Sequence, residues 1–191
     1  MVHGNPRGYG NYIASHRDET SVERKIVVKF ATRYRFAGQL DQVSAHGFEK
    51  LTNDIYREAL RVALGYSAFE QLMKLPKVRG LASVKIPHIA SEFRSGPMEK
   101  FRNLLVEGSN LSLRQELLSL IESDKNQNVL PVIKATRNAT FHGVLSPGSM
   151  GFRSMRGLKF LEGLSQGLFI EMDRLFDLYL QQEKLKKLKS Q

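Results

Sequence analysis

Apolar side chains recur every three or four residues along most of this chain, which is the spacing of one face of an α-helix. The most regular stretch runs from about Gln39 to Leu75 and is ended by Pro76 and Gly80. Its apolar positions are Phe48, Leu51, Ile55, Ala59, Val62, Tyr66, Phe69 and Leu72. This pattern predicts a long helix with one buried face.

A second long helix is predicted from about Phe152 to Lys187. Gly157, Gly163 and Gly167 lie within it, and each costs roughly 1 kcal/mol of helix propensity relative to alanine. The pattern gives no reason for these glycines. The apolar positions of this helix are Phe160, Leu164, Leu168, Met172, Leu175, Phe176 and Tyr179.

Shorter helices are predicted between the two long ones, over about 98–107, 111–123 and 126–142. Ser109 and Asn110 are candidate N-caps. Pro131 falls in the first turns of its helix, and Gly143 suits the C-terminal cap. Segment 76–97 contains three prolines and two glycines, so we expect a loop or short turns there.

The N-terminal part is less regular. Residues 1–19 are rich in glycine and polar residues and are expected to form a flexible arm. A helix then begins near Thr20, which has capping-box spacing to Glu23. The run Lys25–Phe36 is also rich in β-branched and aromatic residues, so a strand is the alternative there. The helical interpretation rests on the four-residue spacing of Val22, Ile26, Phe30 and Tyr34.

Together these elements amount to five to seven helices, without a convincing pair of strands. The fold class expected is all-α, a bundle of long antiparallel helices around one core. A length of 191 residues fits one such domain, which we place at residues 20–191, after the arm.

Composition narrows the class of protein further. No run of 18 or more apolar residues is present, so no membrane span and no membrane partner are expected. The first residues lack the apolar core of a secretory signal. The absence of cysteine excludes disulfides and thiolate chemistry and agrees with a reducing compartment. The expected localisation is cytoplasmic.

The chain is basic, with 29 Lys and Arg against 19 Asp and Glu and a formal net charge of +10. Basic surfaces attract phosphate backbones, which favours RNA as a partner, although basic proteins also arise for solubility alone. Arg33 and Arg35, flanked by Tyr34 and Phe36, would suit stacking of single-stranded RNA. An amphipathic helix explains the same residues, so both interpretations stay open.

The run Arg137–His142 (R-N-A-T-F-H) holds the candidate chemistry. A guanidinium binds phosphate oxygens bidentately and stays charged, whereas an imidazole accepts or donates a proton near neutral pH. Helical residues five apart differ by roughly 140° in direction, yet both side chains are long enough to reach one crevice. An Arg and a His near a helix end also occur by chance.

RNA cleavage through the ribose 2′-OH needs a base, an acid and positive charge on the phosphate, but no metal. We therefore assign proton transfer to His142 and phosphate binding to Arg137. Asn138 would bind the phosphate or orient the histidine, and Thr140 is a weaker supporting candidate. No convincing carboxylate cluster for magnesium is present, so neither a metal nor a cofactor is expected.

The run Ala135–Gly143 also resembles the R-N-x-x-x-H signature of the HEPN superfamily, whose catalytic members are metal-independent RNA endonucleases. Upstream, Gly65–Glu70 is similar to the aromatic–small–Phe–Glu segment of an earlier helix in that superfamily. The order of this segment, the motif and a long closing helix also agrees. The resemblance covers roughly residues 40–180.

This resemblance implies a four- to five-helix bundle that forms a homodimer, with both motifs facing one cleft. Glu70 would lie near the motif as a substrate-binding residue and hold Arg137 by an ion pair, the alternative being an ordinary solvated carboxylate. The implied activity is that of an endoribonuclease toxin or defence effector, with an antitoxin or nucleotidyltransferase as a candidate partner. A catalytically inactive HEPN module that binds RNA or a protein is the first alternative, and a purely structural helical protein the second.

Overall fold

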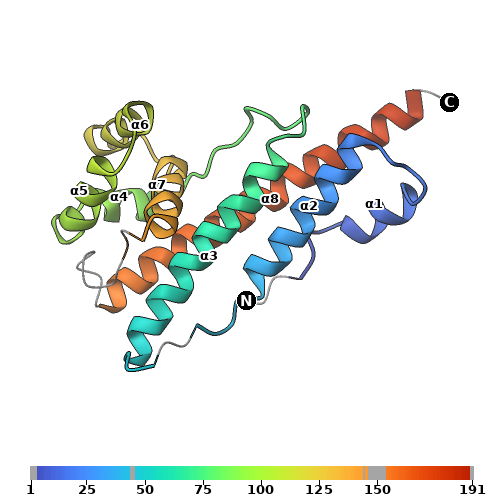
Figure 1. The fold of residues 1–191 in the computed structure, drawn as a ribbon. Helices are drawn as coiled ribbons and strands as arrows, with labels where there is room; N and C mark the ends of the chain where they lie inside the picture. The colour runs from blue at the N-terminus through green and yellow to red at the C-terminus, as the bar shows by residue number, and fades with distance from the viewer. Residues whose placement is uncertain (1–3, 44–45, 144, 146–153, 190–191) are drawn as a thin grey trace.

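The structure, a computed structural model, describes residues 4–43, 46–143, 145 and 154–189. These residues contain α-helices and no β-strand, which confirms the all-α fold class (Figure 1). None of the described helices combines the length and the apolar composition of a membrane span. The elements are α1 (Tyr9–Ser15), α2 (Val22–Gly38), α3 (Lys50–Leu72), α4 (Pro87–Arg94), the 3-10 turn η1 (Gly96–Met98), α5 (Glu99–Glu107), α6 (Leu111–Glu122), α7 (Leu130–Phe141) and α8 (Met155–Lys189).

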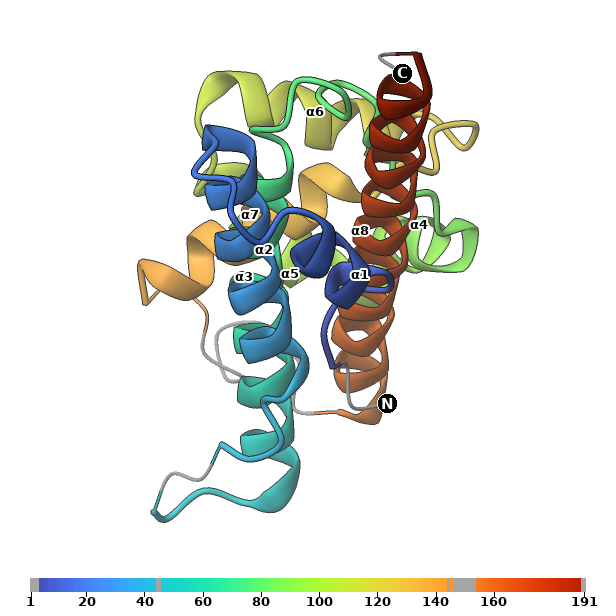
Figure 2. The ribbon, with the colours of Figure 1, turned by 90° about the vertical axis from the view of Figure 1, so that its right-hand side faces the viewer.

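Helix α3 lies at the centre of the fold, with α2, α7 and α8 packed against it. Figures 1 and 2 show that α2 runs opposite to α3, whereas α3 and α8 run in the same general direction. The expected antiparallel arrangement of long helices therefore holds for α2 and α3 but not for α3 and α8. The reason lies in the connection between them, because helices α4–α7 return the chain to the end at which α3 began.

The two apolar patterns that predicted the long helices form the core. Of the pattern on α3, five residues are fully buried and Tyr66 is 7% exposed, whereas Leu51 is half-buried. The prediction that Phe48 belongs to the core is wrong. Phe48 precedes α3, is exposed and contacts Tyr56. Every apolar position predicted on α8 is buried: Phe160, Leu164, Leu168, Met172, Leu175, Phe176 and Tyr179.

Residues 22–38 form a helix rather than the strand that remained an alternative. Its N-cap is Ser21, whose side chain accepts a hydrogen bond from the backbone N–H of Arg24, so Thr20 is not the cap. Of the four residues in the predicted spacing, Phe30 and Tyr34 are buried and Ile26 is partly buried, but Val22 is 73% exposed. The spacing therefore describes the buried face only from Ile26 onward, and Val27 adds to that face.

The N-terminal segment differs from the flexible arm expected for residues 1–19, because part of it folds as α1 and packs onto α8. Tyr12 is buried, and its hydroxyl lies 3.4 Å from that of Tyr179. Tyr179 in turn donates a hydrogen bond to Glu23 at the start of α2. The ring of His16 stacks on Tyr12. A few anchoring side chains thus order a segment whose overall composition is that of a loop.

Segment 76–97 also contains more structure than its prolines and glycines suggested. Pro87 occupies the first turn of α4, where a missing backbone N–H costs nothing, and Ile89, Ala90 and Phe93 face the core. The other caps agree with prediction. Asn110 caps α6, Pro131 lies in the first turn of α7, and Gly143 ends α7 with a φ of 68°.

The glycines of α8 allow the segment around α4 to approach the helix closely. A Cβ atom on Gly163 would clash with the Ile89 side chain, whose Cγ1 would be 2.9 Å away. A Cβ atom on Gly167 would clash with Ile86 and lie 3.2 Å from Cγ1 of Val84. Close packing is therefore the reason, absent from the sequence pattern, for two of the glycines.

Replacing Gly167 by alanine should therefore destabilise the fold, measured as the free energy of unfolding in urea. Alanine gains about 1 kcal/mol of helix propensity, but crowding a packed contact costs about 1–3 kcal/mol. The control is Gly10→Ala in α1, since a Cβ there meets no atom within 4 Å and should leave stability unchanged or raised. Equal or greater stability of Gly167→Ala relative to wild type would contradict the packing explanation.

Candidate functional site

The candidate site lies at the C-terminal end of α7. The buried face of this helix, which includes Val132, Ile133 and Thr136, packs on the core, and α7 contacts α3 extensively. Arg137 and Asn138 are partly exposed on the other side, and Phe141 and His142 are exposed. The helix end therefore brings the predicted residues to the surface rather than into the core.

The guanidinium of Arg137 is fixed by three contacts and remains 31% exposed. Its Nη1 donates a hydrogen bond to Oδ1 of Asn138 at 2.9 Å, and its Nη2 lies 3.5 Å from Oε2 of Glu70 on α3. Its central carbon lies 5.3 Å from the ring centroid of Phe141. Arginine carries five N–H donors, so both Nη atoms keep one for an anion.

The ion pair between Glu70 and Arg137 that the resemblance implied is present. Glu70 itself is 43% exposed, and ion pairs at such sites contribute about 0–1 kcal/mol to stability. The main effect of this pair is therefore geometric, because it connects the end of α7 to α3 and limits the directions that the guanidinium can take.

His142 is the C-cap residue of α7, and its backbone N–H bonds to the carbonyl oxygen of Asn138. Within the described residues its imidazole has no hydrogen-bond or ion-pair partner, and it is exposed. Asn138 does not orient this imidazole, since its side-chain oxygen accepts from Arg137. Thr140 donates its hydroxyl proton to the carbonyl oxygen of Thr136 at 2.8 Å, so that proton serves the helix itself.

Tyr66 is a neighbour of this site that the sequence analysis assigned only to the core. Burial, followed by the negative charge of Glu70, raises the pKa of its phenol to about 12. The positive charge of Arg137 acts in the opposite direction. Tyr66 precedes Glu70 by one helical turn, and this spacing was the available signal that both residues face α7.

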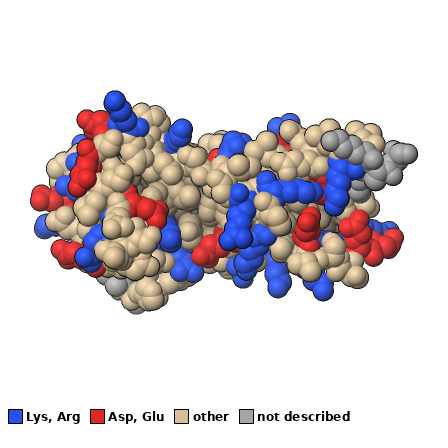
Figure 3. Space-filling view, turned by 90° about the horizontal axis from the view of Figure 1, so that it is seen from above, with Lys and Arg blue, Asp and Glu red and all other residues tan. Residues whose placement is uncertain are grey.

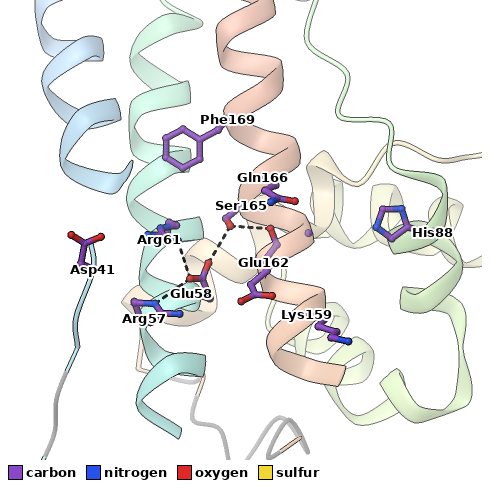
Figure 4. A pocket seen from close by; sticks show the side chains of 11 residues that line it. Asp41, Arg57, Glu58, Arg61, His88, Lys159, Glu162, Ser165, Gln166 and Phe169 are labelled. Carbon is purple, nitrogen blue, oxygen red and sulfur yellow. Dashed lines mark hydrogen bonds and ion pairs between the residues drawn. The ribbon is translucent and has the colours of Figure 1, made fainter. Parts of the chain in front are cut away.

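A second charged cluster, between α3 and α8, was not predicted (Figure 4). Glu58 is buried there and accepts hydrogen bonds from Arg57 at 3.2 Å, Arg61 at 3.0 Å and Ser165 at 3.2 Å. The adjoining pocket has a volume of about 500 Å³, and Arg137 and His142 are not among its lining residues. The sequence feature that could have identified this cluster is the position of Glu58 within the apolar pattern of α3, three residues after Ile55.

The other histidines that the structure describes, His16, His46 and His88, do not assemble into a metal site. His46 and His88 are exposed, and His16 is buried against Tyr12. Over residues 4–43, 46–143, 145 and 154–189, no group of three or more histidine or acidic side chains is arranged to hold a metal ion.

Comparisons of the chain with protein-family models, with curated proteins and with solved structures found no match. The functional interpretation therefore depends on the chemistry of the residues at the end of α7 and on the motif that they form.

The environment of Tyr66 predicts a specific loss of stability at high pH. The phenol has a pKa near 10 in the unfolded chain and about 12 in the folded protein, so the folded state holds the proton more tightly. The resulting stabilisation is complete below pH 10 and is lost as the pH rises toward 12. In Tyr66→Phe, the free energy of unfolding should fall less than in wild type between pH 10 and 12. Equal slopes in the two proteins would contradict the assignment.

Proposed function

We propose that the protein is a metal-independent endoribonuclease that cleaves RNA by 2′-OH transesterification and leaves a cyclic phosphate and a 5′-hydroxyl. The observation that carries this proposal is the presence, at one end of α7, of a fixed, partly exposed guanidinium and of an exposed imidazole that has no partner among the described residues. The R-N-x-x-x-H motif of the HEPN superfamily is the second support.

In the proposed reaction, a base removes the proton of the ribose 2′-OH, and the 2′-oxygen attacks the adjacent phosphorus. The bond from phosphorus to the 5′-oxygen then breaks, and an acid gives a proton to that oxygen. The free N–H groups of Arg137 would bind the non-bridging oxygens, on which negative charge accumulates in the transition state. RNA itself supplies the nucleophile.

A single imidazole is poorly placed to act at both ends of an in-line displacement. We therefore include a two-fold homodimer in the proposal, in which one His142 acts as base and the partner's His142 as acid. Asn138 would act by holding the guanidinium, and Glu70 by orienting it.

By analogy with HEPN proteins, the corresponding biology is a cytoplasmic toxin or defence effector controlled by an antitoxin or nucleotidyltransferase partner. A module that binds RNA without cleaving it is the second candidate. It is favoured by the Arg137–Glu70 contact, because the carboxylate neutralises part of the charge that catalysis would use.

The decisive variant is His142→Ala, with His46→Ala as the matched control, since both histidines are exposed and His46 lies outside α7. Loss of a general acid or base lowers the rate by about 10²–10⁴-fold. Cleavage of a labelled RNA in buffer with EDTA should fall by this amount in His142→Ala and in Arg137→Ala, and should not change in His46→Ala. The products should carry 2′,3′-cyclic phosphate ends.

The following outcomes would contradict the proposed nuclease. Cleavage that survives in His142→Ala, or that continues when the attacked 2′-OH is replaced by hydrogen, would refute the mechanism. RNA binding by wild type without any cleavage in EDTA would identify the non-cleaving module. Absence of RNA binding even at low salt would refute both candidates, because electrostatic affinity is greatest there.

A further inference from the structure

Helix α2 carries a concentration of positive charge that the proposed chemistry does not use. It holds five Lys and Arg against one Glu, and therefore four of the ten net positive charges of the chain. Lys25, Lys29, Arg33 and Phe36 are exposed and fall within an arc of about 80° on this helix. We call these four residues the α2 stripe. The single acid, Glu23, accepts a hydrogen bond from Tyr179 of α8.

The α2 stripe differs from the basic and aromatic patch, Arg33 to Phe36, that the sequence suggested. Tyr34 is buried and donates a hydrogen bond to Asp173, so it cannot stack on a base at the surface. Arg35 is exposed but points about 160° away from Arg33 around the helix. Only Arg33 and Phe36 of the original patch remain on one face, and Lys25 and Lys29 extend it.

A contact between α2 and α3 places the stripe across α3 from the candidate site. Nη1 of Arg33 donates hydrogen bonds to the carbonyl oxygen and to the side-chain oxygen of Ser67, at 3.2 Å and 3.0 Å. Ser67 precedes Glu70, the partner of Arg137, by three residues, which is about 5 Å along the helix axis. Figure 1 shows α2 and α7 flanking α3, so that α3 lies between the stripe and the candidate site.

The face between these helices is open and mainly basic. Lys74 is exposed one turn beyond Glu70, and its hydrogen bond to Gln71 leaves its charge free. Seen from above in Figure 3, Lys and Arg side chains lie over the middle of the molecule, and most Asp and Glu side chains lie toward its two ends. An exposed aromatic ring stands at each side of this face, Phe36 at 63% and Phe141 at 50% exposure.

We propose that a single-stranded RNA segment binds across this face, from the end of α7 over α3 and onto the α2 stripe. Its phosphates lie along Lys25, Lys29 and Arg33, and its bases stack on Phe36 and Phe141. This inference deepens the proposed function and rests on it for the location of the scissile phosphate. The binding surface itself is independent of catalysis.

Two features favour a single strand over other polyanions. Stacking on exposed rings requires unpaired bases, which a duplex keeps within its own stack. An anionic membrane surface would attract the same lysines, but the apolar face of α2 is already buried through Val27, Phe30 and Tyr34. Only Val22 and Phe36 remain exposed among the large apolar residues of this helix, which is too little for insertion into lipid.

The test uses an unstructured 2′-O-methyl oligonucleotide, which cannot be cleaved through its 2′-oxygen, and measures binding by fluorescence anisotropy against salt concentration. The variant Lys25→Gln/Lys29→Gln removes two charges from the stripe. Lys100→Gln/Lys125→Gln removes two exposed charges outside α2, one on α5 and one between α6 and α7, and serves as the control. Each lost phosphate contact should lower the slope of log K against log salt by about 0.7, so the stripe variant should lose about 1.4.

The contribution of the Phe36 ring to binding is tested with a separate variant. Phe36→Ala should weaken binding of the oligonucleotide about tenfold without changing the salt slope, whereas Val22→Ala, at another exposed position of α2, should not weaken it. Equal losses in the two double-lysine variants, or no loss in the stripe variant, would overturn the inference. So would tight binding to phosphatidylserine vesicles without binding to the oligonucleotide.

These results can be separated from the fate of the nuclease proposal. Stripe-dependent binding by a protein that never cleaves RNA would refute the nuclease and retain the surface. Cleavage that depends on His142 but proceeds at an unchanged KM in Lys25→Gln/Lys29→Gln would retain the nuclease and refute the surface.

Discussion

Helix α3 is packed against three other helices at once, and this constraint determines where the charged side chains can lie. Its buried residues, among them Ile55, Val62 and Leu72, turn toward the core. The polar residues that remain are confined to the gaps between neighbouring helices. Glu70 falls beside α7 and Ser67 beside α2, while Glu58 falls beside α8. The positions of these residues along α3 thus set the spacing of three separate polar contacts.

The long helices could be predicted from sequence because burial of an apolar face repeats with the period of the helix. Prediction from this periodicity failed for segments in which only a few residues are buried. In α1, Tyr12 alone enters the core deeply, so no period exists to detect. The direction of α8 relative to α3 could not be predicted either, because it depends on how the intervening helices return the chain.

The candidate site was predictable to a similar extent. The motif identified Arg137 and His142. Tyr66 was assigned only to the core, although its spacing of one helical turn from Glu70 was a signal that both residues face the same way. The partner of Asn138 was not predictable, because a carboxamide can bond to any neighbouring donor and only the folded geometry selects Arg137. Glu58 was not predicted because an acidic residue within an apolar pattern looks like an interruption of that pattern. Only the folded structure shows that Arg57 and Arg61 donate hydrogen bonds to it.

The proximity of Tyr66 to the Arg137–Glu70 contact has a practical consequence for spectroscopy. The chain has no tryptophan and six tyrosines, so its ultraviolet emission comes from phenol rings alone. An anion that draws Arg137 away from Glu70 changes the electric field at one of those rings. Occupancy of the end of α7 is therefore open to observation through the protein's native fluorescence, without an attached dye.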